Sequence, residues 1–257
     1  MSDADAPSTP VISPEPADRR AAPPTPLDRV LSLVEVTVCS GFPTQLLILV
    51  VLHLAGQSPT DADGRLRPVF IAMLSLADAM LVVGLVALFV VRRGESMREL
   101  LLGRRPAARE AALGAALVPP VLLGVVALVL GLRLLAPSLH NVPRNPLEDL
   151  LQRPGDVWLF SLVLVVAGGL REEVQRAFIL RRFERELGGA LVGLVLFSLV
   201  FGAGHLDQGR DVAITTAVLG GFWGGLYLAR RSIVATAVSH AGFNLSEIAR
   251  YVLLREA

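Results

Sequence analysis

Long apolar runs separated by short polar segments make up most of the chain after residue 28. Each run has about twenty residues, which is the length a helix needs to cross a hydrocarbon layer of ~30 Å. The runs cover residues 30–55, 68–91, 111–135, 157–180, 188–205, 212–229 and 232–253. The pattern predicts an all-α fold, a polytopic transmembrane helix bundle with about seven spans.

The polar segments predict the organisation around these spans. Residues 1–28 are rich in Pro, Ala, Asp and Ser and contain no long apolar stretch, so we expect a disordered tail and no cleavable signal peptide. Residues 92–110 are amphipathic and arginine-rich, which favours a position at the membrane surface. We therefore divide the chain into the tail, N-terminal transmembrane helices over 29–156, and a C-terminal helix bundle over 157–257.

Composition agrees with a membrane protein and excludes other classes. Hydrophobic residues make up 53% of the chain and charged residues 18%, against about 25% charged in an average soluble domain. The net charge of +1 gives no sign of a nucleic-acid partner, and the single Cys39 excludes a disulfide framework. Membrane lipid is the expected surrounding, and nothing in the sequence specifies an oligomeric state.

The arginines predict the orientation in the membrane. They concentrate in the tail and in residues 92–109, 181–185 and 230–231, which are alternate connections between spans. Positively charged residues collect on the cytoplasmic side. We therefore expect a cytoplasmic N-terminus and a C-terminus on the opposite side.

Four charges interrupt the fourth apolar run: Arg171, Glu172, Glu173 and Arg176. Each charge at the centre of a span costs roughly 2.5–3.5 kcal/mol on insertion scales. The two glutamates and Arg176 share one arc of a helix, so they can pair and offset part of that cost. Alternatively, the helix ends at the interface and its arginines reach lipid headgroups.

Two histidines lie in apolar segments on two further spans. Phe201 and His205 are four residues apart, as are His240 and Asn244, so each pair projects from one helix face. Three helices thus offer carboxylates, imidazoles and an amide to a shared interior. Such a set can activate water.

Other polar or small residues in the spans favour helix packing. Glu35, Gln45 and Asp78 in the first two spans are interpreted as helix-to-helix hydrogen-bonding groups. The glycine-rich residues 220–225 permit close helix approach. Pro43 is expected to kink the first span, and Pro119 with Pro120 the third.

The order Glu-Glu…Arg, Phe-x-x-x-His and His-x-x-x-Asn resembles the CPBP intramembrane proteases, which include the type II CAAX prenyl endopeptidases and the bacterial Abi proteins. The resemblance covers about residues 157–253. The family's first motif has three residues between the second glutamate and the arginine, whereas only two separate Glu173 from Arg176 here. Anchoring on the arginine or on the glutamates gives two alignments, and we favour Glu172 as the family's general base, with Glu173 second.

The resemblance implies an intramembrane endopeptidase of a bacterial inner (plasma) membrane that cleaves membrane-anchored peptides or proteins. It implies that His205 and His240 either bind a divalent metal, possibly zinc, or stabilise an oxyanion together with Asn244 without metal. The implied site residues are Glu172, Glu173, Arg176, His205, His240 and Asn244. Two alternatives are a non-catalytic immunity or scaffold protein and, less favoured because no inverted repeat is visible, a proton- or metal-coupled transporter.

Overall fold

The computed structural model describes residues 23–255, and the described part is built from helices without a β-strand. This confirms the predicted all-α class. Most of the predicted tail, residues 1–22, lies outside the described residues. The tail's predicted end at residue 28 is too late, because the first helix begins at Pro26. Thr25 caps that helix by accepting a hydrogen bond from the Asp28 backbone amide, and the Asp28 carboxylate accepts one from the Thr25 amide in return.

Ten α-helices and four short or unusual helical segments follow one another in the described residues. In chain order they are α1 (Pro26–Val38), α2 (Phe42–Leu54), α3 (Pro68–Arg92), α4 (Met97–Leu101), α5 (Ala107–Leu135), η1 (Pro137–Leu139), η2 (Pro146–Leu151), α6 (Pro154–Val163), η3 (Leu164–Arg171), α7 (Glu172–Arg185), α8 (Ala190–Ala203), η4 (Leu206–Gln208), α9 (Arg210–Arg230) and α10 (Val234–Arg255). Segment η3 is a π-helix, and the others named η are 3₁₀ helices.

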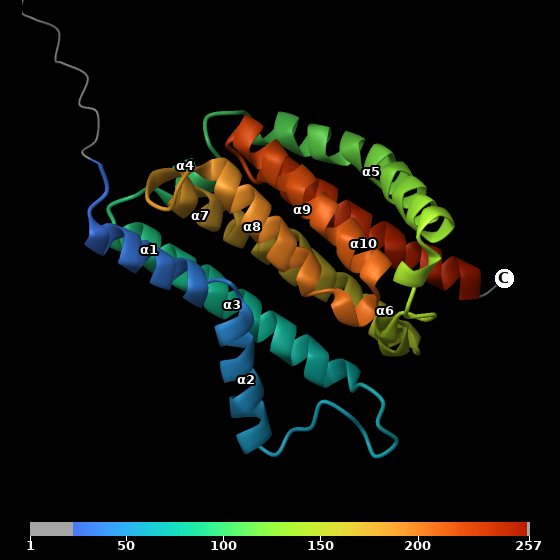
Figure 1. Cartoon of the computed structure of the whole chain (residues 1–257). Coiled ribbons are helices and arrows are strands. Elements are labelled where there is room, and N and C mark those ends of the chain that lie inside the picture. The colour runs from blue at the N-terminus through green and yellow to red at the C-terminus, as the bar shows by residue number, and fades with distance from the viewer. Residues whose placement is uncertain (1–22, 256–257) are drawn as a thin grey trace, which may run out of the picture.

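A long helix made of α6, η3 and α7 lies in the middle of the bundle. Helix α10 packs along η3 and along α5, whereas α8 packs between α7 and α9. On the opposite side, α3 contacts α6, η3 and α7, and α1 contacts α7 (Figure 1). Residues from both halves of the chain therefore surround the charged stretch that begins at Arg171.

The first apolar run is broken rather than continuous. Helix α1 ends at Val38, Gly41 adopts a φ of 91°, and α2 leaves at a bend of 46° (Figure 1). Pro43 lies in the first turn of α2, where its missing amide hydrogen costs nothing. The predicted kink is thus present, but it is a full break placed before the proline. By contrast, α5 continues through Pro119 and Pro120.

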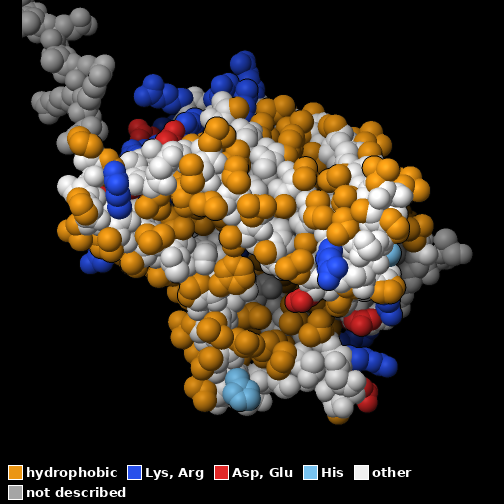
Figure 2. Space-filling model, viewed as in Figure 1, with side chains coloured by type: hydrophobic (Ala, Val, Ile, Leu, Met, Phe, Trp, Pro, Cys, Tyr) orange, Lys and Arg blue, Asp and Glu red, His pale blue; other side chains and the backbone are white. Residues whose placement is uncertain are grey.

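Three helices of the described residues are long and apolar enough to cross a membrane: α3, α5 and α9. The broken pair of α1 and α2 raises this number to four if it is counted as one span. About seven crossings are therefore not confirmed, since α8 is short and the α6–α7 helix and α10 carry polar and charged residues. Apolar side chains cover much of the visible face (Figure 2), and the chain is an integral membrane protein.

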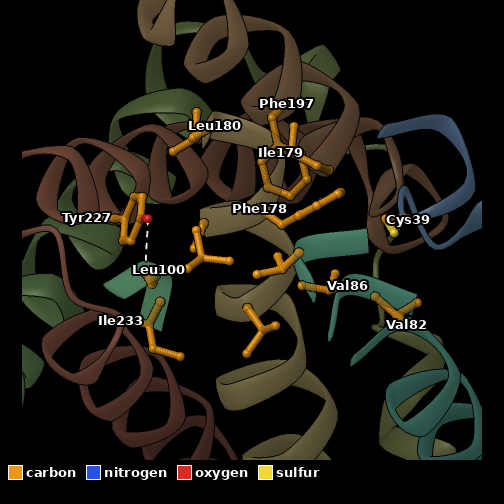
Figure 3. Packing of buried hydrophobic residues seen from close by; sticks show 13 residues of the cluster. Cys39, Val82, Val86, Leu100, Phe178, Ile179, Leu180, Phe197, Tyr227 and Ile233 are labelled. Carbon is orange, nitrogen blue, oxygen red and sulfur yellow. Dashed lines mark hydrogen bonds between the residues drawn. The ribbon is translucent and has the colours of Figure 1, made fainter. Parts of the chain in front are cut away.

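The largest buried apolar cluster joins both halves of the chain beside the charged stretch. Its members are Cys39, Val82, Val86, Val90, Leu100, Val174, Ala177, Phe178, Ile179, Leu180, Phe197, Tyr227 and Ile233 (Figure 3). Tyr227 donates a hydrogen bond of 3.1 Å to the carbonyl oxygen of Leu100 on α4. This bond ties part of the arginine-rich segment 92–110 to the end of the bundle.

Candidate active site

Close contact between η3 and α10 brings the glutamates beside a histidine. Gly168 and Gly169 lie on η3, and a Cβ at Gly169 would lie 2.7 Å from Cβ of Ala241 and 3.2 Å from its Cα. Only a residue without a side chain fits there. Glu172 and Glu173 follow Gly169 by three and four residues, and His240 directly precedes Ala241, so this contact brings the glutamates close to the His240 ring.

Glu173 lies at the centre of a buried ionic group. Its side chain is 1% exposed and pairs with Arg176, which is fully buried. The same carboxylate oxygen lies 2.9 Å from Nδ1 of His240. Burial of an ion pair is costly, and removal of one partner leaves an uncompensated charge. Glu173 therefore both neutralises Arg176 and fixes the orientation of the His240 ring.

Aromatic rings enclose the guanidinium and the imidazole. The Arg176 guanidinium lies 5.3 Å from the ring centre of Phe197, 5.0 Å from that of Phe201 and 5.9 Å from that of Trp223. The Trp223 ring stacks on His240 at 3.8 Å. Cation–π attraction in a desolvated site offsets part of the cost of burying the arginine. The Trp223 and Phe201 rings both pack against His240 and therefore limit rotation of the imidazole.

Glu172 has a different environment from its neighbour. Its side chain is 21% exposed and lines a cavity of about 140 Å³, which His205 also lines. One Glu172 oxygen lies 3.8 Å from Nε2 of His240, a distance longer than a hydrogen bond. Arg176 pairs with Glu173, so the predicted sharing of the arginine by both glutamates is wrong for Glu172. Its carboxylate is instead directed to the cavity.

His205 lies just after the C-terminus of α8 and lines the same cavity as Glu172. Its Nδ1 donates to the carbonyl oxygen of Phe201 at 2.9 Å, which leaves Nε2 free of that bond. The Phe201 ring packs edge-on against His205 at 5.2 Å between ring centres and against His240 at 6.3 Å. The predicted packing of Phe201 on His205 is confirmed.

Asn244 lies one turn after His240 on α10 and is half-buried. Its amide nitrogen contacts Gly168, where a Cβ would come within 2.6 Å of it. The residues that line the cavity do not include Asn244. The structure thus brings together five of the six predicted residues around the cavity and the buried pair, with Asn244 at their edge.

Metal ligands were predicted at His205 and His240. Within residues 23–255, no group of three or more His, Cys, Asp or Glu side chains is arranged to hold a metal ion. Both ring nitrogens of His240 face glutamates, and Nδ1 of His205 is occupied by a backbone carbonyl. The donors do not fit a closed or three-ligand zinc site, so we derive no step through a metal.

Several residues around the cavity were not assigned to the site from the sequence. Gln45, Arg171 and Gln175 line the cavity, and Trp223 packs on His240. Gln175 lies three residues after Glu172, a spacing that places it on the same helix face. The helical spacing from Glu172 could therefore have identified Gln175 as a site residue. Gln45 and Trp223 come from distant helices, and no spacing rule connects them to the motifs.

The alternative in which the arginines of this stretch reach lipid headgroups is not what the structure shows for two of them. Arg171 is 7% exposed and Arg182 is fully buried. Arg171 pairs with Asp78, and Arg182 pairs with Glu35 and Glu95. The predicted helix-to-helix role of Asp78 and Glu35 is confirmed by these pairs.

Comparison with known families agrees with the resemblance. The family model described as type II CAAX prenyl endopeptidase Rce1-like matches residues 154–246. The matched segment begins at α6 and ends within α10, so it contains the glutamates and both histidines. No curated protein and no solved structure gives a significant match. The matched family is a family of proteases, which supports a peptidase.

Proposed function

We propose that the protein is an intramembrane endopeptidase that hydrolyses peptide bonds of membrane-anchored substrates, with Glu172 as general base. The observation that carries this proposal is the difference in environment between the adjacent glutamates Glu172 and Glu173. Glu173 is buried and committed to Arg176 and His240, whereas Glu172 is partly exposed in a cavity that His205 also lines. A general base needs a carboxylate that a water molecule can reach.

The proposed reaction begins with a water molecule in the cavity. Glu172 removes a proton from the water while its oxygen attacks the peptide carbonyl carbon, and the carbonyl electrons form an oxyanion. The tetrahedral intermediate then collapses, the carbon–nitrogen bond breaks, and the protonated Glu172 delivers its proton to the leaving amine. His205 orients the water by accepting a hydrogen bond at Nε2.

The buried ionic group of Glu173, Arg176 and His240 supports the same reaction. Because Glu173 holds Nδ1 of His240, the other ring nitrogen is directed to the Glu172 side. In the protonated ring, Nε2 donates to the oxyanion, and one such donor contributes about 10²–10³ in rate. Asn244 supports α10 at Gly168 beside this histidine. A divalent metal at His205 and His240 stays a prediction that this mechanism does not use.

The test compares variants in lipid vesicles with a library of membrane-anchored peptides. We expect Glu172→Gln to lower the cleavage rate by about 10²–10⁴ without loss of thermal stability, and His205→Ala to lower it as well. Glu247→Gln and His53→Ala are controls, since neither residue lines the cavity. Absence of cleavage by the wild type, or full activity of Glu172→Gln, would contradict the proposal and favour a non-catalytic membrane protein.

We also infer that the arginine-rich end of the bundle faces the cytoplasm of a bacterial cell. Contacts between Arg93 and Glu35, Arg230 and Glu110, and Arg231 and Glu184 gather the arginine-rich connections at one end. Positive residues favour the cytoplasmic side. A cysteine introduced at exposed Arg105 should resist a membrane-impermeant maleimide in intact cells, and one at exposed Asp63 should react.

A further inference from the structure

The break between α1 and α2 forms part of the cavity wall, although it lies outside the segment that matches the family. Ser40, Gly41, Phe42 and Gln45 line the same cavity as Glu172 and His205. The N-terminal helices therefore contribute directly to the surroundings of the proposed base. What holds the break in place is a buried polar network.

Asp78 on α3 is the centre of this network. Its side chain is 3% exposed, and its carboxylate accepts from the Arg171 guanidinium at 2.5 Å and from the Thr44 hydroxyl at 2.5 Å. The Gln45 amide donates at 3.5 Å to Asp78 Oδ2, the same oxygen that accepts from Arg171. One carboxylate thus joins α3, the start of α2 and the residue directly before Glu172.

A second connection reaches Cys39, the first residue of the break. Arg171 donates to the Gln175 side-chain oxygen at 3.0 Å, and the Gln175 amide donates to the backbone carbonyl of Cys39 at 2.6 Å. Gly41 permits this arrangement, because its φ of 91° suits glycine and a Cβ there would overlap the Arg171 guanidinium. The guanidinium therefore lies directly against the backbone of the break.

From this network we propose that the Asp78–Arg171 pair is a positioning device that clamps the α1–α2 break into the wall of the active-site cavity and thereby sets the position of Glu172. This inference rests on the proposed function for its catalytic consequence. Arg171 precedes Glu172 in the chain, so a shift of the guanidinium moves the helix turn that carries the base. A displacement of about 1 Å in a catalytic group costs up to about 100-fold in rate.

The clamp can be measured without any substrate, because Cys39 is the chain's single cysteine and is fully buried at the break. Its alkylation by N-ethylmaleimide in detergent micelles reports opening of the break. We expect Asp78→Asn and Gly41→Ala to accelerate alkylation by about tenfold or more, since weaker pairing raises the population of locally open states. The wild type should react slowly.

The matched control is Gly56→Ala at the other end of α2. Gly56 has a φ of 74°, so alanine there suffers similar backbone strain, but nothing lies within 4 Å of its added Cβ. We expect alkylation of Cys39 in this variant to match the wild type. Thermal unfolding of each variant shows whether faster alkylation reflects local opening or global loss of the fold.

Cleavage kinetics then test positioning. We expect Gly41→Ala and Asp78→Asn to lower kcat by about 10–100-fold with a much smaller change in KM, and Gly56→Ala to keep both constants. Unchanged Cys39 alkylation in Gly41→Ala and Asp78→Asn would overturn the clamp. Faster alkylation with an unchanged kcat would overturn the positioning of Glu172. If the wild type cleaves nothing, the proposed function fails, while alkylation still decides whether the clamp exists.

Discussion

At the scale of single residues, adjacent glutamates have opposite relations to water. Glu173 is enclosed by Arg176, His240 and aromatic rings, and Glu172, one position earlier, reaches the cavity. Successive residues of an α-helix point about 100° apart, so one turn of α7 can contribute one carboxylate to a buried ionic group and the other to the cavity. The two positions are therefore expected to respond differently to the same substitution.

Glu173→Gln is expected to destabilise the fold as well as the activity. It leaves the fully buried Arg176 without a counter-charge, and it replaces the carboxylate that orients His240 with a neutral amide oxygen, which is a weaker acceptor. Breaking a buried pair costs about 3–5 kcal/mol, so the free energy of unfolding should fall by this order. Denaturant or thermal unfolding in detergent measures the change. A Glu173→Gln protein as stable as Glu172→Gln would contradict the assignment of structural and catalytic roles.

The sequence predicted which residues form the candidate site better than it predicted which side chains contact one another. Residue types and helical spacing identified Glu172, Glu173, His205 and His240, because spacing along one helix determines which side chains share a face. Spacing does not determine which of two neighbouring glutamates takes the arginine, since i,i+3 and i,i+4 pairs are both possible. Contacts such as Asp78 with Arg171 depend on how distant helices pack, and one sequence contains no direct signal for that.

At the scale of helices, close approach of η3 and α10 is what aligns the glutamates with His240. Gly169 allows Ala241 of α10 to contact the backbone of η3. The sequence indicated close packing at the glycines of α9, and the structure shows it there too, where Gly224 meets Leu194. The comparable role of Gly168 and Gly169 was not predicted, because two glycines in an apolar run do not indicate which distant helix packs against them.

Gly169→Ala is expected to weaken both packing and catalysis. The added Cβ would push against Cβ and backbone atoms of Ala241, which cannot rotate away. Overpacking of this kind costs about 1–3 kcal/mol, and displacement of α10 should reduce the cleavage rate. In the control Gly225→Ala, nothing lies within 4 Å of the new Cβ. There, higher helix propensity should stabilise the protein by up to about 1 kcal/mol. Equal behaviour of the two variants in thermal unfolding would refute the packing argument.

At the scale of the whole molecule, an ionic cluster joins the N-terminal helix to the C-terminal half at one end of the bundle. Glu35 on α1 pairs with Arg93 and Arg182, and Glu95 after α3 pairs with Arg181, Arg182 and Arg185. The apolar pattern predicted separate spans but not these links. Alternation of apolar and polar segments reports which residues enter the membrane, and it does not report which ends meet.

Glu95 should make stability depend on pH. Burial raises the pKa of Glu95, but the hydrogen bond from Arg182 and the charges of Arg182, Arg185 and Arg181 lower it more, so the net pKa lies below its usual value. A lowered acid pKa contributes stability that is complete above the unfolded-state pKa of about 4.5 and is lost as pH falls through the folded-state pKa. We expect the melting temperature to fall in that acidic range.

The matched variants are Glu95→Gln and Glu186→Gln in the same cluster. Burial raises the pKa of Glu186, against the lowering by Arg182 and Arg93, so its ionised form does not stabilise the fold at neutral pH. Glu95→Gln should lower the free energy of unfolding at pH 7 by about 1–3 kcal/mol and flatten the acid loss, and Glu186→Gln should not lower it. Melting curves between about pH 2 and 7 distinguish the two, and an identical response would count against this account.

The π-helical segment η3 makes the central helix sensitive to its own length. Residues 164–171 carry the chain from α6 into α7, and every side chain from Glu172 to Arg185 takes its angular position from the way these residues wind. Deleting or inserting one residue there rotates the side chains of α7 by about 100° about the helix axis. The Glu172 carboxylate would then turn from the cavity toward a neighbouring helix. An insertion or deletion in the connection between α2 and α3 does not rotate α7 in this way. The length of η3 therefore determines which way the catalytic side chains of α7 point.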